Sequence, residues 1–383
     1  MIKMNQEFPP FSLKRLLKTV FAPQKGESIC ILIDLTDPKL VKNFEFLQDE
    51  TLTIQRYAHD VFYHGLQSGI LNELGLVGGE FYAYEVTEGS NLDLADQVYS
   101  TSGSELSFEK DIYPKYDIIL CISTNSATAP LTASAKIHKF RGATLHGLNQ
   151  TILDSGLSVD YNEVSSDAEK LRKGMTCADY VELEFSVADR KFSLRIDLDG
   201  QEAQKSQGLC RGKIPDIANL PAGEIYFVPS SAKGQFPMKY EEDGTLGLMN
   251  VKNGRIVEAT LLSGNSQTVE AHMSKIKSDP VVGELGELGF GTQVLPVSGR
   301  DIQDEKILGT FHIATGRSDH LGGHLTPDKF LHKRNATHDD ILFAPHKTPE
   351  VKAPRVRAFW GDRSEVIIEN YEPSKYLKSL LLD

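Results

Sequence analysis

The sequence predicts an α/β N-terminal domain with a parallel sheet over residues 1–180. A β-rich (α+β) C-terminal domain that binds metal is expected to follow, over residues 181–383. Three observations predict this. Residues 28–35 form a continuous apolar run, typical of a parallel strand buried on both faces. Strand-like and helix-like segments alternate before residue 180, whereas short alternating runs dominate after it. Six of the eleven histidines lie between His312 and His346.

Four strands are expected in the first domain, over residues 28–35, 80–86, 116–123 and 143–145. A long amphipathic stretch over residues 41–74 predicts helix after the first of them. Further helical patterns fall between and after the later strands. Strands that alternate with helices favour a parallel sheet covered on both faces.

The second domain is expected to be mostly antiparallel. Asp-Gly turns at Asp199 and Asp243 separate short strand-like runs, which is the pattern of hairpins. One helix is expected near residues 269–277, and another closes the chain over residues 373–382. The expected strands cover residues 181–185, 192–196, 224–228, 255–262, 310–314, 341–344 and 366–369.

Composition excludes several classes of protein. The net charge of −12 disfavours nucleic acid as a partner, because phosphate binding needs a basic face. No apolar run is long enough to span a bilayer, and the N-terminal segment is not a secretion signal, so a cytoplasmic location is expected. The four cysteines form no C-x-x-C pair, which excludes a zinc ribbon.

Metal-ligand residue types gather in four short segments of the second domain. NLPAGEIYFVP delivers Glu224 to the start of an apolar strand, and GELGELGFGTQ holds Glu284 and Glu287 among glycines. His312 interrupts the strand-like run of LGTFHIATG. His338 and Asp340, in NATHDDILFAP, are two residues apart, so on a strand they point to the same side.

Imidazole and carboxylate ligands suit zinc, cobalt, manganese and iron(II). Two metal ions need a shared carboxylate with further ligands on either side, and the five residues Glu224, Glu287, His312, His338 and Asp340 are such a set. The same residues also have ordinary explanations, because acids at strand starts and histidines in loops are often simply solvated. Spacing alone leaves both interpretations open.

The order of these segments resembles the M29 family of metallo-aminopeptidases, over about residues 219–345. The resemblance implies that Glu224 bridges two metals and that Glu287 is a ligand, with Glu284 as the second choice. HIATG matches the family's segment that contains a ligand histidine, here His312, and His338 and Asp340 match its His-x-Asp pair. It also implies an N-terminal α/β domain, a β-rich metal domain and a homodimer.

The chain departs from that family at Asp319, where the family has a catalytic-site tyrosine. This loop resembles a divergent branch that is also similar to 2,5-dihydroxypyridine 5,6-dioxygenase. That resemblance implies one non-haem Fe(II) held by His312, His338 and Asp340, with open positions for O₂ and substrate.

The carboxylates Glu224 and Glu287 favour a dinuclear hydrolase over an iron dioxygenase, because an iron triad requires neither. The expected enzyme is an aminopeptidase with two zinc, cobalt or manganese ions that activate water. A free carboxylate, Glu284 or Asp319, is the expected general base. Its substrate would be a short peptide or another small molecule. One Fe(II) with ring-cleaving activity is the alternative, and a non-catalytic metal-binding relative is a third interpretation.

Overall fold

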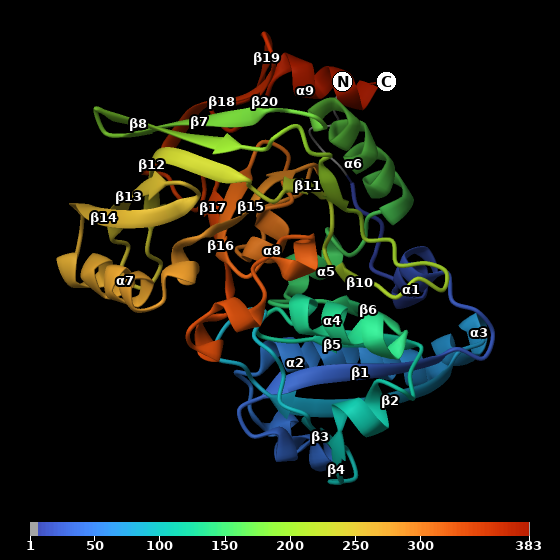
Figure 1. Cartoon of the computed structure of the whole chain (residues 1–383). Helices are drawn as coiled ribbons and strands as arrows, with labels where there is room; N and C mark the ends of the chain where they lie inside the picture. Colours follow the sequence, from blue (N-terminus) through green and yellow to red (C-terminus); the bar gives the residue numbers. More distant parts are fainter. Residues whose placement is uncertain (1–6, 383) are drawn as a thin grey trace.

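A computed structural model describes residues 7–382, which fold into two stacked halves (Figure 1). The lower half in Figure 1 is built on a seven-stranded sheet in the order β10-β6-β5-β1-β2-β3-β4. Its strands are β1 (Ser28–Leu35), β2 (Val77–Glu85), β3 (Gln97–Ser100), β4 (Glu105–Ser107), β5 (Ile118–Ile122), β6 (Arg141–Thr144) and β10 (Ile217–Asn219). Strands β10 to β2 pair in parallel, and β3 and β4 add an antiparallel edge.

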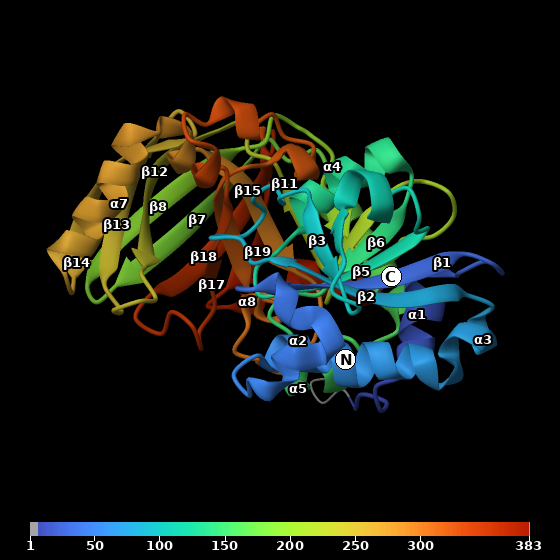
Figure 2. The same ribbon diagram turned by 90° about the horizontal axis from the view of Figure 1, so that it is seen from below.

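Helices cover both faces of this sheet, as Figure 2 shows for α1 to α3 on one side and α4 on the other. Strand β1 explains why: Ile29, Ile31 and Ile33 pack with α1, whereas Cys30 and Leu32 pack with α4. Each such apolar side chain stabilises the fold by about 1.5–3 kcal/mol. The helical elements of this half are α1 (Leu13–Phe21), η1 (Pro38–Gln48), α2 (Thr53–Tyr57), η2 (Ala58–Tyr63), η3 (Leu66–Ile70), α3 (Leu71–Leu74), η4 (Phe108–Ile112), α4 (Thr128–His138), α5 (Gln150–Asp154) and α6 (Tyr161–Met175).

The stretch over residues 41–74 is not one regular helix. Its first part is a 3₁₀ segment interrupted at Asn43 and Phe44, which both have a positive φ angle. Two π-helical segments, η2 and η3, follow α2 before the chain returns to α-helix in α3. The amphipathic pattern indicated helix here but carried no signal for the kinks.

Two antiparallel sheets form the second half. One has five strands in the order β17-β16-β15-β11-β9, and the other has eight in the order β14-β13-β12-β8-β7-β18-β19-β20. Phe185 of the larger sheet contacts Phe311 and Phe343 of the smaller one, with ring centroids 6.1 and 4.9 Å apart. The smaller sheet contains β9 (Gln204–Ser206), β11 (Glu224–Phe227), β15 (Leu285–Gly291), β16 (Phe311–Gly316) and β17 (His338–Phe343).

The larger sheet contains β7 (Tyr180–Val187), β8 (Arg190–Asp197), β12 (Ser231–Lys239), β13 (Leu246–Lys252), β14 (Arg255–Ser263), β18 (Lys352–Trp360), β19 (Arg363–Glu369) and β20 (Glu372–Pro373). The helical elements here are α7 (Ser266–Ser278), η5 (Pro280–Gly283), α8 (Asp301–Asp304), η6 (Asp319–Leu321), η7 (Pro327–Lys329), η8 (Lys333–Asn335) and α9 (Lys375–Leu382). Mixed sheets with helices, followed by a strand-rich region, are compatible with the expected fold class.

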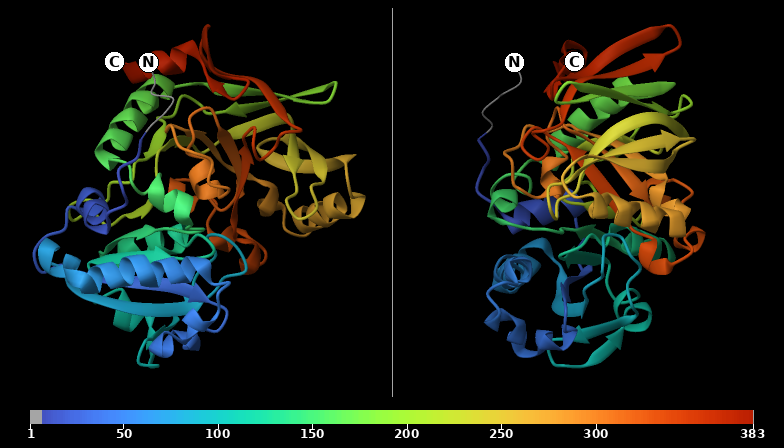
Figure 3. Two further views of the ribbon diagram at one scale, coloured as in Figure 1. Left: turned by 180° about the vertical axis from the view of Figure 1, so that it is seen from behind. Right: turned by 90° about the vertical axis from the view of Figure 1, so that its left-hand side faces the viewer.

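One strand from the later part of the chain belongs to the first sheet. Strand β10 follows residue 180 in sequence, yet it pairs in parallel with β6 at the edge of the first sheet. The chain then passes directly into β11 of the second half, so β10 and β11 carry it from one half to the other. Figure 3 shows the two halves from two further sides. The expected boundary at residue 180 stays a prediction. Within residues 7–382, no helix combines the length and apolarity that crossing a bilayer requires.

Candidate metal centre

The candidate ligands lie on one face of the five-stranded sheet. Along β16, Phe311 and Ile313 are part of the core between the two sheets, so His312 projects from the opposite face. Along β17, His338 and Asp340 are two residues apart and project from this same face, whereas Ile341 and Phe343 pack in the core. Glu224 is the first residue of β11. Period-two alternation therefore separates an apolar face from a face that carries imidazoles and carboxylates.

A β-bulge places Glu287 on the same face. Leu285 belongs to the core, and in a regular strand the residue two positions later would share its side. The pairing of β15 with β16 shifts between Leu285 and Glu287, so Leu285 pairs with Thr315 and Glu287 pairs with Ala314. The bulge turns the carboxylate of Glu287 away from the core and towards the other candidate ligands.

Strand register brings these side chains together. Ala314 of β16 lies between Glu287 on one neighbouring strand and Asp340 on the other. His312 is opposite Gly289, where an added Cβ would come within 2.1 Å of the imidazole Cε1. Only glycine at this position leaves room for the ring of His312.

Both imidazoles approach the same two carboxylates through their Nε2 atoms. For His312, Nε2 lies 3.4 Å from Glu287 Oε1 and 3.9 Å from Asp340 Oδ1. For His338, Nε2 lies 3.0 Å from Glu287 Oε2 and 3.4 Å from Asp340 Oδ1. Glu224 Oε2 lies 3.8 Å from Nε2 of His312. The structure thus brings all five predicted ligands into one cluster.

The chemistry of this donor set fits a transition-metal ion. The Nδ1–H of His338 donates to the backbone carbonyl oxygen of Arg317 at 2.6 Å. Because a carbonyl oxygen can only accept, this bond fixes the proton on Nδ1 and leaves Nε2 to face the carboxylates. Outer hydrogen bonds of this kind orient histidine ligands at metal sites.

The charge balance perturbs the protonation of both rings. Burial lowers the pKa of His312, but Glu287, Glu305 and Asp340 outweigh it and raise that pKa to about 10. His338 is likewise raised well above its ordinary pKa, because Asp340 and Glu287 outweigh burial. Burial raises the pKa of Glu287 and of Asp340, yet the two histidines hold both values below normal. The neighbouring carboxylates therefore favour the charged form of both imidazoles.

A buried lysine also contacts this cluster. Lys306 Nζ lies 2.7 Å from Glu224 Oε2 and 2.5 Å from Glu305 Oε1, and 1% of its side chain is exposed. Burial raises the pKa of Glu305, and Lys306 opposes it, leaving a pKa of about 7. Gly291 makes room for the backbone of Lys306 and Ile307, since a Cβ at this position would lie 2.1 Å from the Ile307 carbonyl oxygen. The ammonium therefore neutralises part of the acidic cluster.

The cluster forms one wall of a cavity of about 190 Å³ between the two halves. The opposite wall comes from the first sheet, whose parallel strands end there: Ser126 follows β5, His146 follows β6, and Asn219 ends β10. Ligands of open parallel sheets bind outside these carboxyl ends. His320 and His146 also line the cavity. Burial lowers the pKa of His320 to about 3 and that of His146 to about 4, so both rings are neutral at pH 7.

The two predicted general bases lie outside this cluster. Glu284 forms an ion pair with Arg255, and Asp319 binds the guanidinium of Arg317 with Nε 2.7 Å from Oδ1. Neither residue lines the cavity. Their assignment as bases stays a prediction, and the geometry gives it no support.

Sequence reasoning missed Glu305, Lys306 and His146. The Glu305-Lys306 pair follows Asp304 in a charged run, a pattern that is typical of a solvated turn rather than a buried ion pair. His146 follows a short strand, and its only signal was its place at the carboxyl end of that strand.

No protein-family profile matches the chain, and no curated protein is similar to it in sequence. The resemblance to the M29 aminopeptidases therefore finds no support in these comparisons. One solved structure that is similar is that of 2,5-dihydroxypyridine dioxygenase from Pseudomonas putida KT2440. It shares 11% identity, with a TM-score of 0.58, and covers 91% of this chain and 92% of its own. At this identity the similarity concerns the fold.

Proposed function

We propose that this chain is a mononuclear non-haem iron dioxygenase that cleaves a small hydroxylated aromatic ring. The iron would be held by His312, His338 and Asp340, a set of two imidazoles and one carboxylate that leaves positions open. The fold similarity to a dioxygenase over nine-tenths of both chains supports this reaction class. The convergence of both Nε2 atoms on Asp340 supports the ligand set.

The observation that carries the choice of one metal over two is the ion pair of Lys306 with Glu224. In a dinuclear centre, Glu224 would bridge both ions, with bonds of about 2 Å. The ammonium of Lys306 already lies 2.7 Å from that carboxylate. Positive charges about 4 Å apart repel by about 4 kcal/mol per pair of unit charges at a protein-like dielectric, and a divalent ion doubles this. The positive charge of Lys306 thus takes the place of a second metal ion beside Glu224.

The cavity suits a ring-sized molecule. A cavity of about 150 Å³ accommodates benzene, so 190 Å³ holds one substituted ring with little excess space. An Fe(II) ion in the centre would supply the redox chemistry by which O₂ reacts with such a ring.

The protein's own groups would bind and orient this substrate. The neutral rings of His146 and His320 offer hydrogen bonds to hydroxyl or ring-nitrogen groups. Glu305, with a pKa of about 7, is poised to accept a proton from a substrate hydroxyl at neutral pH.

A dinuclear hydrolase is the second candidate, because Glu224 and Glu287 both join the cluster. The metal content of the wild type and of two matched variants distinguishes the dioxygenase from this hydrolase. After anaerobic loading, the wild type should hold one Fe(II) per chain and consume O₂ with 2,5-dihydroxypyridine. Glu224→Gln should retain that iron, whereas Asp340→Asn should lose it. Two zinc, cobalt or manganese ions per chain with hydrolysis of aminoacyl-p-nitroanilides would overturn the proposal, as would bound iron without turnover of any ring substrate.

A further inference from the structure

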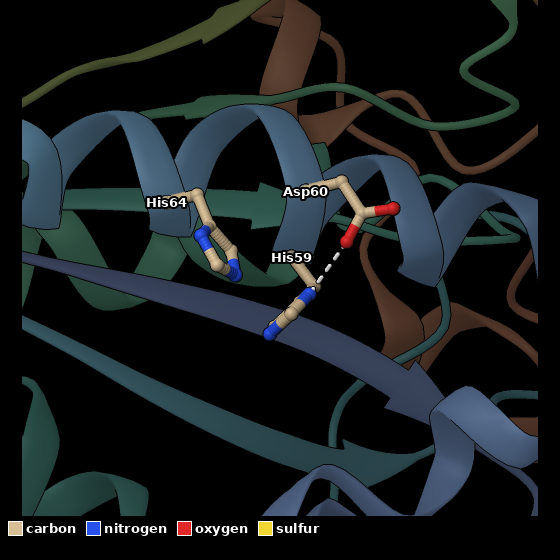
Figure 4. A group of neighbouring side chains, drawn as sticks. All are labelled: His59, Asp60 and His64. Carbon is tan, nitrogen blue, oxygen red and sulfur yellow. Dashed lines mark hydrogen bonds and ion pairs between the residues drawn. The ribbon is translucent and has the colours of Figure 1, made fainter.

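A second group of metal-ligand side chains lies on the first half, away from the cavity. His59, Asp60 and His64 project from the helical segment that covers one face of the first sheet (Figure 4). One ligand atom from each residue lies within 4.8 Å of the others. None of the three lines the cavity described above.

A π-helical turn brings the two histidines together. In an α-helix, with 3.6 residues per turn, residues five apart point about 140° away from each other. Here the backbone N–H of His64 donates to the carbonyl oxygen of His59, which closes an i→i+5 turn. Figure 4 shows both rings on the same side of the helix, and their centroids are 4.6 Å apart. Single π turns inside helices are frequent at functional sites.

The ring of His59 is held in place before any ligand binds. Its Nδ1 lies 2.7 Å from Asp60 Oδ1, and 11% of its side chain is exposed. The ring of Phe44 packs against it at 4.7 Å between centroids. Phe44 itself has a φ of 59°, a left-handed conformation that is strained for a bulky residue. Strain of this kind is maintained only where the surroundings fix the geometry.

We propose that His59, Asp60 and His64 form a second metal site, for a divalent first-row transition ion such as Zn²⁺. Two imidazoles and one carboxylate are the ligand types that such ions favour. Ligand atoms bonded to one zinc ion lie roughly 3.4 Å apart, so small side-chain rotations within the existing cluster are enough. Asp60 and His64 are exposed, so water completes the coordination sphere. The bound ion would clamp the π turn from outside the catalytic cavity.

The experiment is equilibrium dialysis with Zn²⁺ on the full chain, in a His338→Ala background that weakens the cavity centre. In that background, adding His64→Ala should remove one equivalent of bound zinc, or weaken its binding by at least tenfold. His324→Ala is the matched control, because His324 is also exposed and belongs to no metal-ligand cluster among residues 7–382.

His64 is exposed, so its replacement should leave the circular dichroism spectrum unchanged. Asp60→Asn should weaken zinc binding less than His64→Ala does. Equal zinc stoichiometry and affinity with and without His64 would overturn the proposal. So would a loss of zinc in the His324→Ala control equal to that in His64→Ala.

Discussion

At the scale of single residues, metal and protons compete for the same imidazole atoms. The pKa of His312 is about 10, and that of His338 is also raised, so both rings are protonated in the metal-free protein at pH 7. Glu287 and Asp340 have lowered pKa values and are already ionised. Metal can bind only when Nε2 of each ring loses its proton.

Metal binding at pH 7 should therefore release protons, and the affinity should rise as pH rises towards 10. With two protons displaced, the increase approaches roughly 100-fold per pH unit. Isothermal titration calorimetry with Fe(II) or Zn²⁺, in two buffers of different ionisation enthalpy, measures the released protons. An affinity that is flat between pH 6 and pH 8 would show that the rings are not protonated in the apo protein.

Some site residues could be identified from the sequence and others could not. His338 and Asp340 were identifiable because a strand with a spacing of two puts both side chains on one face. Glu287 was identifiable by residue type, but the bulge that aims it was not. Lys306 had no signal, because burial of a lysine depends on carboxylates that are distant in sequence, such as Glu224.

At the scale of elements, the segment after β16 ties the metal centre to the first half. Arg317 donates to Asp319, to Asp93 at 2.8 Å and to the Asn91 carbonyl oxygen at 2.7 Å. Its own carbonyl oxygen accepts the Nδ1–H of His338. A single buried residue therefore fixes the loop and orients a metal ligand.

Arg317→Met should destabilise the protein by about 3 kcal/mol or more, because a buried hydrogen bond to a charged group is worth about 1.5–3 kcal/mol and the variant loses the bonds to Asp319 and to the Asn91 carbonyl oxygen. Metal affinity should also fall, since the backbone carbonyl of residue 317, which orients His338, remains but is no longer held in place by the guanidinium. Urea unfolding and iron content measure the two effects. Arg355→Met is the matched control: Arg355 pairs with Glu184 at the surface, where ion pairs contribute about 0–1 kcal/mol. Equal costs for the two variants would contradict the role of Arg317.

Elements with a strong periodic pattern were predictable, and irregular ones were not. The strand over residues 28–35 was predicted with the bounds of β1, because its run is apolar throughout. The predicted helix over residues 41–74 is broken by backbone conformations at Asn43 and Gly69 that only the packed structure selects. Strand β10 is three residues long, and its partner β6 is more than 70 positions earlier, so no local pattern could assign it.

At the scale of the whole molecule, the two halves contribute different parts of the site. Every candidate ligand of the cavity centre belongs to the second half, whereas the first sheet supplies the opposite wall of the cavity. Because the ligands come from neighbouring strands of one sheet, metal binding depends on that sheet. Substrate binding depends on how the two halves meet. The homodimer expected from the family resemblance stays a prediction.

His146 tests this division of labour, because it reaches the cavity from the end of β6 and belongs to none of the metal-ligand clusters among residues 7–382. Its pKa of about 4 keeps the ring neutral, and its buried Nδ1 has no hydrogen-bond partner within that range, so it is free to bind substrate. His146→Leu should retain one iron per chain while KM rises about tenfold, the equivalent of one lost hydrogen bond of about 1.4 kcal/mol. Steady-state O₂ uptake and iron analysis provide both readouts, with His324→Leu as the control outside the cavity. Loss of iron in His146→Leu would instead show that the first half contributes to the metal centre. An unchanged KM would show that His146, and with it this wall of the cavity, does not bind substrate.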